Sequence, residues 1–547
     1  MKISKISVSL ALLMVLAGGT GCEKFLDVND DPINPSAVPV SLLLPATQAA
    51  MSTSLGHSVL GLSQPAAAIM QQLVNGRVGT YGLDGNSFNN QWQGLYTNML
   101  ANNEAIIQQG TATAAWTYVG IAQIQKAHVF SQMVDMWGDI PYSEALQGSQ
   151  SAINPQTANP RFDDDAQIYA DLFRLIDEGI ENLRRTDSGG IPPGGDDLIY
   201  GGNRTKWIRL AATLKLKLYN QVRLVQDVRT PVQTLLTQDM QNTQNMITAG
   251  DDFELRYGTS AGNPENRHPG FQGDYAGSAR ENNINRFFYD LMRATTDPRI
   301  PYYFFNQVTS AAALTNVDYQ DGRFITTRFG SQGPQANANT SNTRTLQGLY
   351  PIGGRFDNGT GLTGGATGLS GRGNVPQRFI TFFARKFIEA ELQLMVLNNP
   401  VAARTAFEEA VRASFAKINT IVSTTSPAEG VTPAYTAPVP TIADPAIQAY
   451  VTAALARFDA ASGNEGKLNI IMTEKYIANY GTGTDVYTDY RRTGYPRIPY
   501  SDLPAYPGTV QTGAFPVRFP YRVNDLLTNT NAPDQPNVTT EKIFWDR

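Results

Sequence analysis

The sequence contains a single cysteine, Cys22, among its 547 residues. A lone thiol excludes a disulfide within the chain, and it excludes zinc sites that are built from two to four cysteines. Cys22 is therefore a buried apolar residue, a nucleophile or an attachment point. The histidines are few as well, and His57, His128 and His268 lack metal-ligand spacing. No P-loop or dinucleotide-binding pattern is present, so we expect neither a metal site nor a cofactor.

Long hydrophobic runs are also missing. The most apolar stretch, residues 6–17, is too short to cross a bilayer, which takes about 20 residues, and no later segment is longer. This stretch follows Lys2 and Lys5 and precedes small residues, which is the layout of a secretory signal. We therefore expect residues 1–21 to be a signal peptide, and we expect the exported chain to lack a transmembrane helix.

The place of Cys22, directly after this leader, resembles the lipobox of bacterial lipoproteins. In those proteins the thiol receives a diacylglyceryl group, the leader is cleaved before the cysteine, and the new amino terminus is acylated. Several acyl chains, such as palmitate, anchor a protein firmly because each buried CH₂ contributes about 0.8 kcal/mol. We expect lipidated Cys22 to begin a tether over residues 22–40. The alternative is an ordinary signal peptide that is cleaved nearby, with an idle cysteine.

Charge is scarce, since Asp, Glu, Lys and Arg make up 17% of the chain and the formal net charge is −5. Soluble proteins usually have about 25% charged residues. An acidic chain without a basic stripe argues against nucleic acid as a partner. Aromatic residues reach 10%, with 24 Tyr and 24 Phe, and this content suits a surface on which ligands stack.

Helical periodicity dominates two parts of the sequence. It predicts helices at 91–109, 114–137, 205–225, 442–459 and 468–480, and another helix after Asp163–Asp165, which supply an N-cap and an acidic first turn. In the block 377–415, a turn at residues 398–400 precedes a spacing found in the second helix of a tetratricopeptide repeat. There, small residues let the paired helix approach closely. The residues with this spacing are Ala403, Phe407 and Ala410.

Residues 250–375 and the tail 491–547 lack such periodicity. The stretch 354–373 has too much glycine for a helix, and the tail is rich in Pro and Tyr. Long loops on a helical scaffold usually carry function. We therefore predict a mainly α domain over residues 41–547. Its helical scaffold spans about 41–250 and 376–490. Its loop-rich part, which is expected to carry the function, spans about 250–375 and 491–547; the resemblance described next implies that this part binds the ligand.

Eight short motifs follow one another along the chain: CEKFLDVNDDP, MVDMWGDIPYSEAL, DLIYGGNRTKWIRLAATLKLKL, DPRIPYYF, KFIEAELQLM, EKYIANY, DYRRTGYPRI and FPVRFPYRVNDLLTN. Together, and in this order, they resemble the SusD/RagB-like outer-membrane lipoproteins. The resemblance implies a tetratricopeptide-like helical scaffold and a lipid anchor at the outer membrane, facing the cell exterior. It also implies a SusC-like TonB-dependent barrel as partner, to which a captured glycan or peptide is delivered for nutrient uptake without catalysis.

We expect the motifs themselves to be mostly structural. Gly138 and Pro141 stop a helix and turn the chain, and Asp139 can accept backbone N–H bonds in that turn. Arg491 and Arg492 are expected to pair with carboxylates and brace the C-terminal segment. The large aromatic residues of the motifs are expected to pack helices together: Trp137, Tyr142 and Trp207.

Ligand contacts are predicted on chemical grounds. Sugars present flat apolar faces that aromatic rings cover, and their hydroxyls are met by amide and charged groups. Residues 80–96 offer both, because Trp92 and Tyr96 lie on one helical face beside a Gly- and Asn-rich loop. The alternative is that these two rings are core residues that anchor the first helix. The predicted ligand-binding residues are Tyr81, Phe88, Asn90, Trp92, Tyr96, Tyr257, Phe271, Tyr275, Tyr302 and Tyr303.

One pattern favours an enzyme. Residues 258–262 fit the Gly-x-Ser-x-Gly nucleophile elbow of α/β-hydrolases, which requires a strand before it and a helix after it. Residues 252–257 could form the strand, but a loop with two prolines follows. His268 is close in sequence only. We therefore expect no enzyme activity. Two alternatives stay open: a secreted hydrolase of the same polymers, whose carboxylate pair would be a matter of geometry, and an adhesin without a role in transport.

Overall fold

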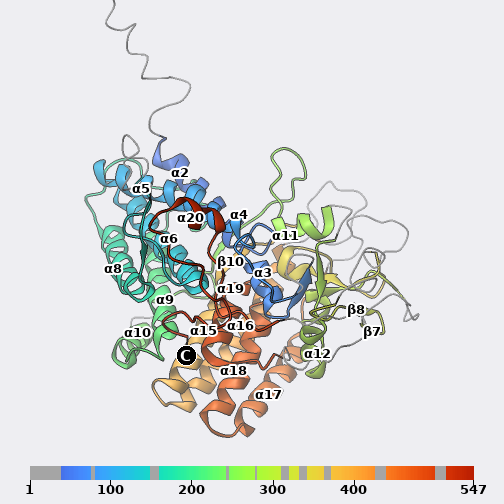
Figure 1. Ribbon diagram of the computed structural model, residues 1–547. Coiled ribbons are helices and arrows are strands. Elements are labelled where there is room, and N and C mark those ends of the chain that lie inside the picture. The colour runs from blue at the N-terminus through green and yellow to red at the C-terminus, as the bar shows by residue number, and fades with distance from the viewer. Residues whose placement is uncertain are drawn as a thin grey trace, which may run out of the picture.

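The computed structural model describes residues 38–75, 80–147, 159–241, 245–276, 280–309, 319–331, 342–361, 371–424, 439–498 and 513–546. The predicted signal peptide, Cys22 and most of the predicted tether lie outside these residues. Helices dominate the described chain and its strands are short (Figure 1). The mainly α fold predicted from the sequence is thus confirmed. In the described part, no helix combines the length and the apolar character needed to cross a bilayer.

The longer helices form two groups that the chain visits in turn. The first group contains α2 (Val40–Leu55), α5 (Ala101–Ala112), α6 (Trp116–Trp137), α8 (Asp165–Arg184), α9 (Arg204–Val222) and α10 (Arg229–Gln241). The second contains α15 (Phe382–Met395), α16 (Pro400–Thr424), α17 (Asp444–Ala460), α18 (Gly463–Ala478) and α19 (Gly483–Thr493). Consecutive helices pack against one another within each group, and α15 also packs on α9, which joins the groups.

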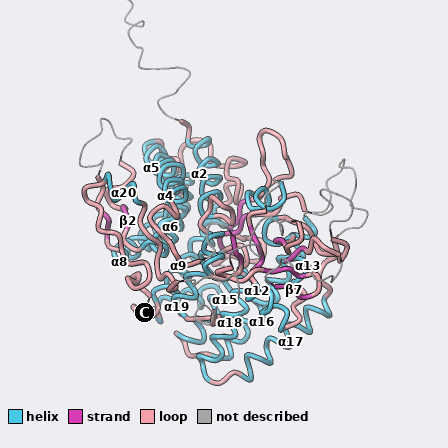
Figure 2. Tube along the Cα trace, turned by 45° about the vertical axis from the view of Figure 1, so that its right-hand side comes forward, coloured by secondary structure: helices cyan, strands magenta, loops and turns pink. Residues whose placement is uncertain are grey.

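Short elements occupy the remaining described chain. The short helices are α3 (Ser63–Ile69), α4 (Asn89–Gln93), α11 (Pro269–Phe271), α12 (Arg286–Ala294), α13 (Ile300–Tyr303), α14 (Leu349–Ile352) and α20 (Val523–Thr528), with π-helical η2 (Gly94–Leu100) and η3 (Gln272–Ala276). The strands are β1 (Leu73–Asn75), β2 (Ile140–Pro141), β3 (Phe162–Asp163), β4 (Phe253–Leu255), β5 (Asn282–Ile284), β6 (Phe304–Phe305), β7 (Tyr319–Asp321), β8 (Phe324–Thr326), β9 (Leu346–Gln347) and β10 (Gln377–Ile380). They form antiparallel pairs, and most of them gather on the side of α12 and α13 (Figure 2).

Several local predictions are confirmed. Asp164 caps α8, since its carboxylate accepts a hydrogen bond of 2.9 Å from the backbone N–H of Gln167. Ala403, Phe407 and Ala410 are all buried on α16, as the repeat spacing requires. Phe407 stacks on Phe458 of α17 with ring centroids 5.5 Å apart. Small side chains on either side of this ring therefore let α16 pack closely on its neighbours.

The predicted helix 91–109 is confirmed as a helical segment, but it contains a π-helical stretch that the sequence did not predict. The structure divides this region into α4, π-helical η2 and α5. A π-helix adds a residue to each turn, which shifts the apolar stripe. Gly94 opens η2 and lies against α2, where a Cβ atom would be 2.6 Å from Ser54 Oγ. Gly94 thus lets α2, a helix that the sequence did not reveal, approach closely at the start of the π-helical stretch.

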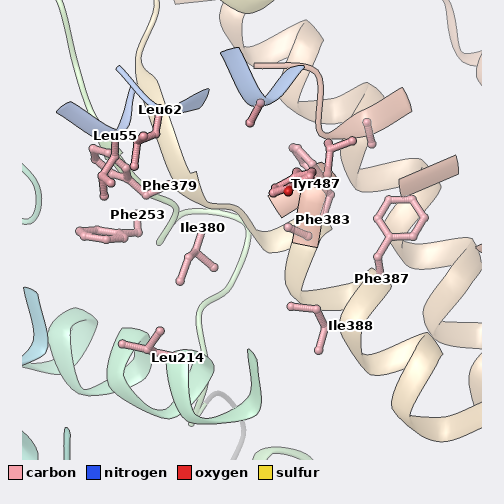
Figure 3. Close-up of a cluster of buried hydrophobic side chains, with 14 of the residues drawn as sticks. Leu55, Leu62, Leu214, Phe253, Phe379, Ile380, Phe383, Phe387, Ile388 and Tyr487 are labelled. Carbon is pink, nitrogen blue, oxygen red and sulfur yellow. The ribbon is translucent and has the colours of Figure 1, made fainter. Parts of the chain in front are cut away.

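Pairing between distant segments connects the loop-rich region to the helices. Strand β4 pairs with β10, which leads into α15, and β1 pairs with β5. Phe253 and Phe379 meet across the first pair with ring centroids 5.0 Å apart, in a core that includes Leu214 of α9 and Phe383 of α15 (Figure 3). A single core therefore serves both regions.

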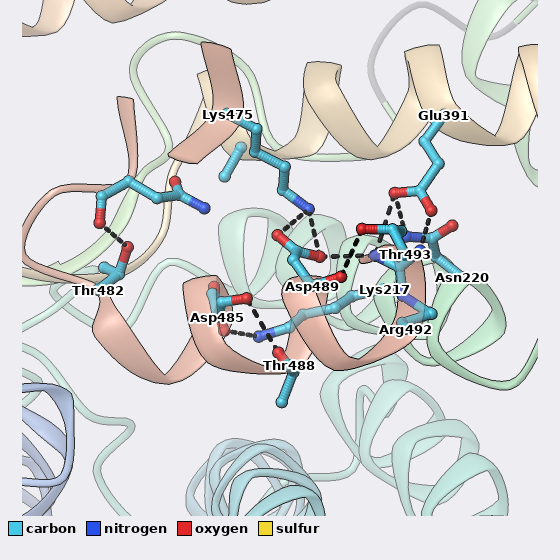
Figure 4. A network of polar contacts seen from close by, with 12 residues as sticks. Lys217, Asn220, Glu391, Lys475, Thr482, Asp485, Thr488, Asp489, Arg492 and Thr493 are labelled. Atoms are coloured by element: carbon cyan, nitrogen blue, oxygen red, sulfur yellow. Dashed lines mark hydrogen bonds and ion pairs between the residues drawn. The ribbon is translucent and has the colours of Figure 1, made fainter. Parts of the chain in front are cut away.

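Buried charges connect α9, α15 and α19 (Figure 4). Glu391 is fully buried, and its carboxylate accepts hydrogen bonds from Arg492, Arg223 and Asn220. The two arginines compensate its negative charge. Arg492 also pairs with Asp489 at 2.6 Å, which confirms the prediction that it binds carboxylates. Because burying a carboxylate without partners is costly, removing either side of such a pair is strongly destabilising.

Arg491 was expected to pair with carboxylates and instead binds backbone oxygens. Its guanidinium donates to the carbonyls of Val517, at 2.7 Å, and of Asp135, and it lies 4.7 Å from the Trp545 ring centroid. It does brace the C-terminal segment, as expected. Trp137 and Trp207 are fully buried, and Asp139 accepts the backbone N–H of Asp165 at 2.9 Å. The motif side chains in these contacts thus have structural roles.

Candidate functional site

A cleft of about 350 Å³ opens beside the segment 80–96. Five parts of the chain contribute its walls: the loop between α2 and α3, the start of α3, the end of β1, the loop that leads into α4, and α4 itself. Its volume lies within the range typical of small-ligand sites, roughly 300–1,000 Å³. The lining residues are Val59, Gln64, Pro65, Asn75, Asp84, Asn86, Ser87 and Gln91.

The loop 84–87 is held by its own hydrogen bonds. Asp84 Oδ1 accepts from the backbone N–H of Asn86 at 2.9 Å and from Ser87 Oγ at 3.3 Å. Ser87 Oγ accepts in turn from the backbone N–H of Asp84 at 3.0 Å. Gly85 packs so closely on the C-terminal segment that a Cβ atom would be 2.4 Å from Val523 Cγ2. This wall of the cleft is therefore fixed before any ligand arrives.

Two buried glutamines form another part of the lining. Gln91 Nε2 donates to the carbonyls of Val59, at 3.2 Å, and Gly61, at 3.5 Å. Gln64 Nε2 donates to Asn282 Oδ1 on β5. The cleft thus presents amide, hydroxyl and carboxylate groups beside small apolar surfaces. Such a set can hydrogen-bond a polyhydroxylated ligand.

The aromatic residues predicted in segment 80–96 lie next to this cleft but face the core. Phe88 stacks on Phe519 with centroids 4.0 Å apart, and Trp92 meets Trp137 edge to face at 5.1 Å. Tyr96 donates its hydroxyl to a backbone carbonyl at 2.7 Å, and burial raises its pKa. Trp92 thus has the packing of a core residue, which was the alternative, and the binding roles of Phe88, Trp92 and Tyr96 stay predictions.

The two other predicted residues of this segment differ from each other. Tyr81 is buried against Phe329 and Phe515, and its hydroxyl accepts from Gln71 Nε2 at 3.1 Å. Asn90 is exposed at the start of α4, directly before Gln91 of the cleft. The structure therefore brings the polar members of the segment, rather than its rings, to the cleft.

The predicted aromatic residues of the middle region lie around α11 and η3. Tyr257 shares a hydrogen bond of 2.7 Å with Ser52, and its hydroxyl has a pKa raised by burial. Phe271 and Tyr275 stack on each other with centroids 5.1 Å apart, and Tyr275 donates to the carbonyl of Gln347 at 2.5 Å. These residues form a separate group from the cleft lining.

Tyr302 and Tyr303 of α13 are both buried. Tyr302 donates its hydroxyl to the carbonyl of Pro440 at 2.5 Å, and Tyr303 stacks on Tyr350 at 4.8 Å. Burial raises the pKa of Tyr302 to about 12. Their part in ligand binding stays a prediction.

A second cleft of about 440 Å³ lies between α6, the β2–β3 pair and α8. Its charged groups already bind one another, since Asp163 accepts from Ser143 Oγ at 2.7 Å and Arg161 Nε at 2.9 Å. Burial favours a higher pKa for Asp163, but these donors lower the pKa below its usual value. Arg174 is paired with Asp171 in the same way at 2.6 Å. This cleft therefore offers a ligand few uncommitted charges.

The Gly-x-Ser-x-Gly segment does not form a nucleophile elbow. Ser260 is exposed in a loop, where its backbone N–H donates to Asn266 Oδ1 at 2.8 Å. The helix that follows, α11, has three residues and begins after His268, which is buried and caps it. Across the described ranges, no group of three potential metal ligands is found.

Sequence reasoning missed most of the cleft lining. Gln64, Asp84 and Gln91 were not predicted, because their side chains are ordinary polar residues without a motif. Asn86 and Ser87 follow a glycine in a polar loop, and this loop was the only signal that the sequence offered.

Residues 32–522 match a protein family described as starch-binding and associating with the outer membrane. The chain belongs to this SusD-like family. The match covers nearly the whole described chain. SusD-like proteins have a tetratricopeptide-like helical scaffold, and this chain therefore has it too. The sequence matches no protein with a curated description.

Solved structures of SusD-like proteins share the fold. A SusD/RagB family protein from Bacteroides thetaiotaomicron is 18% identical, with a TM-score of 0.66 over 93% of this chain and 99% of the other. A SusD homologue from Bacteroides fragilis is also 18% identical, with a TM-score of 0.64 and the same shares covered. A chitin-binding protein is 19% identical, with a TM-score of 0.64 over 92% of this chain and 99% of its own.

Proposed function

We propose that this SusD-like protein is a lipid-anchored receptor on the cell exterior. It captures glycans, or peptides, and delivers them to a SusC-like TonB-dependent transporter in the outer membrane. The cleft beside segment 80–96 carries the proposal, because a preformed wall of amide and hydroxyl groups is suited to binding hydroxyl-rich ligands without changing them. A glycan as ligand is supported by the starch-binding description of the family and by the chitin-binding protein that shares the fold.

The binding mechanism follows from the geometry of the cleft. The hydrogen bonds within loop 84–87 and those of Gln91 hold the polar groups in place before a ligand binds. Less side-chain freedom is then lost on binding, which favours affinity. Val59 and Pro65 supply small apolar patches for the faces of a sugar ring. No covalent step is part of the proposal.

Calorimetry with maltohexaose and chitohexaose tests the proposal. We expect at least one of them to bind, and we expect Asn86→Ala to weaken that binding by on the order of tenfold, because a hydrogen bond in the cleft is lost. Asn98→Ala is the matched control, since Asn98 is exposed on η2 away from the cleft lining. Binding that is equal in both variants would place the ligand elsewhere.

The same oligosaccharides, labelled at one end, separate a binder from an enzyme. A binding protein retains them unchanged, whereas a hydrolase releases shorter products. Turnover by the purified protein would contradict the proposal and favour the hydrolase alternative.

A further inference from the structure

A buried series of side-chain hydrogen bonds leads from the cleft into the protein. Gln64, in the cleft wall, is 2% exposed and donates from Nε2 to Asn282 Oδ1. Asn282 Nδ2 donates to Asp274 Oδ1 at 3.1 Å, and Gln347 Nε2 donates to Asp274 Oδ2 at 2.8 Å. Gln347 Oε1 in turn contacts Nε2 of His57 at 2.7 Å. Asp274 is thus the centre of two branches, of which one ends at the cleft.

The carboxylate of Asp274 fixes the direction of every bond in this series. Besides the two side-chain amides, its Oδ1 faces the backbone N–H groups of Glu281, at 3.2 Å, and Asn282, at 3.1 Å. A carboxylate surrounded by four N–H donors only accepts. Asn282 must therefore turn its NH₂ group toward Asp274 and its oxygen toward Gln64. Gln64 then donates a hydrogen bond to this oxygen from Nε2.

The consequence is a fixed orientation for the amide oxygen of Gln64, a residue that lines the cleft. Because Nε2 of Gln64 is committed to Asn282, its Oε1 is directed away from Asn282, and this atom has no hydrogen-bond partner among the described residues. The amide of Gln91 is fixed in a similar way, because its Nε2 donates to the carbonyls of Val59 and Gly61. Leaving a buried acceptor without a partner is unfavourable, and a hydrogen-bond donor on the ligand removes this cost.

We propose that Asp274 is a positioning residue of the cleft: through Asn282 it holds Gln64 with Oε1 available to the ligand. The cleft therefore selects ligands that donate a hydrogen bond from a hydroxyl group at this point. The inference rests on the proposed function, because it assumes that the ligand binds in this cleft. It adds that the ligand must donate a hydrogen bond to Gln64. It attributes this requirement to Asp274, which lies outside the cleft.

Fluorinated oligosaccharides test the requirement for a donor. Replacing a hydroxyl by fluorine keeps its approximate size and removes its proton. For maltohexaose and chitohexaose with single hydroxyls replaced, we expect one position at which the wild-type protein loses binding on the order of tenfold. Gln64→Met has a similar length and no amide oxygen, so it should bind the parent and fluorinated sugars equally. The same tenfold preference in Gln64→Met would overturn the inference.

Two further variants separate positioning from direct contact. Asn282→Ala releases the amide of Gln64, so the fluorine penalty should fall below about threefold. In Asp274→Asn, the two backbone N–H groups keep the side-chain oxygen of the new residue in the Oδ1 position. Asn282 and Gln64 therefore stay as they are, and this variant should retain the wild-type preference. An unchanged penalty in Asn282→Ala would refute the positioning role.

A measurement without ligand tests the same series from its other end. Burial lowers the pKa of His57 to about 4, so at neutral pH one ring nitrogen holds the proton. The direction set by Asp274 requires this nitrogen to be Nε2, whereas Asp274→Asn turns Gln347 over and moves the proton to Nδ1. Imidazole ¹⁵N NMR shifts distinguish the two forms.

A wild-type His57 that is protonated on Nδ1 would overturn the inference whichever sugar binds, and it stays informative if Asn282→Ala fails to fold. Failure of both sugars to bind would instead contradict the proposed function. The two failures are therefore distinguishable.

Discussion

His57 and His268 are buried side chains that make the stability of the protein depend on pH. Burial is the largest cause that lowers their pKa values, to about 4 for His57 and about 3 for His268, from 6.5 in the unfolded chain. The unfolded state therefore binds more protons below pH 6.5. The stability that the neutral rings contribute is complete above pH 6.5 and is lost as the pH falls toward 4 and 3.

We expect this effect to appear in thermal and urea unfolding between pH 6.5 and 4. The contribution of His57 alone should fall by on the order of 3 kcal/mol. Asp135 and Asp165, whose pKa values burial raises to about 6, act in the opposite direction. The comparison is therefore made with His57→Gln, in which the slope of stability against pH should decrease. An identical slope in this variant would contradict the assignment.

Helix α16 shows how a repeat spacing translates into packing. Ala403 is fully buried, so a larger side chain there must push α16 away from its neighbours. We expect Ala403→Leu to lower the free energy of unfolding by roughly 1–3 kcal/mol, measured by urea denaturation. Val401→Leu on the same helix is the control, because Val401 is 76% exposed and its change should stay within about 0.5 kcal/mol. Equal effects would show that the spacing is irrelevant to packing.

Helices α6, α8 and α9 were predicted close to their observed ranges because apolar residues recur at helical spacing in each of them. Helix α2 was not predicted, since Pro45 lies within it and Pro39, at its N-cap, supplies no capping side chain. The short strands have too few residues for an alternating pattern. Strands β4 and β10, like β1 and β5, pair although they are more than a hundred residues apart, so only the folded chain reveals these pairs.

For the protein as a whole, the anchor is the prediction on which its proposed location depends. Cys22 lies outside the described residues, and its lipidation stays a proposal. We expect mass spectrometry of the native protein to find acyl groups on Cys22, and we expect a TonB-dependent barrel to co-purify from the outer membrane. Cys22→Ala should release the protein from the membrane fraction while leaving its binding of oligosaccharide unchanged. A wild-type protein with an unmodified amino terminus would contradict the proposal.

The sequence by itself determined the mainly α class and the SusD-like family, because apolar periodicity and ordered motifs are properties of neighbouring residues. The export leader stays a prediction. The sequence also predicted segment 80–96 as a ligand-binding region. Only the tertiary structure decided that Trp92 packs in the core while Gln91 lines a cleft. Side-chain direction depends on which distant segment packs against each face, and the orientation of Gln64 depends on a carboxylate more than two hundred residues away.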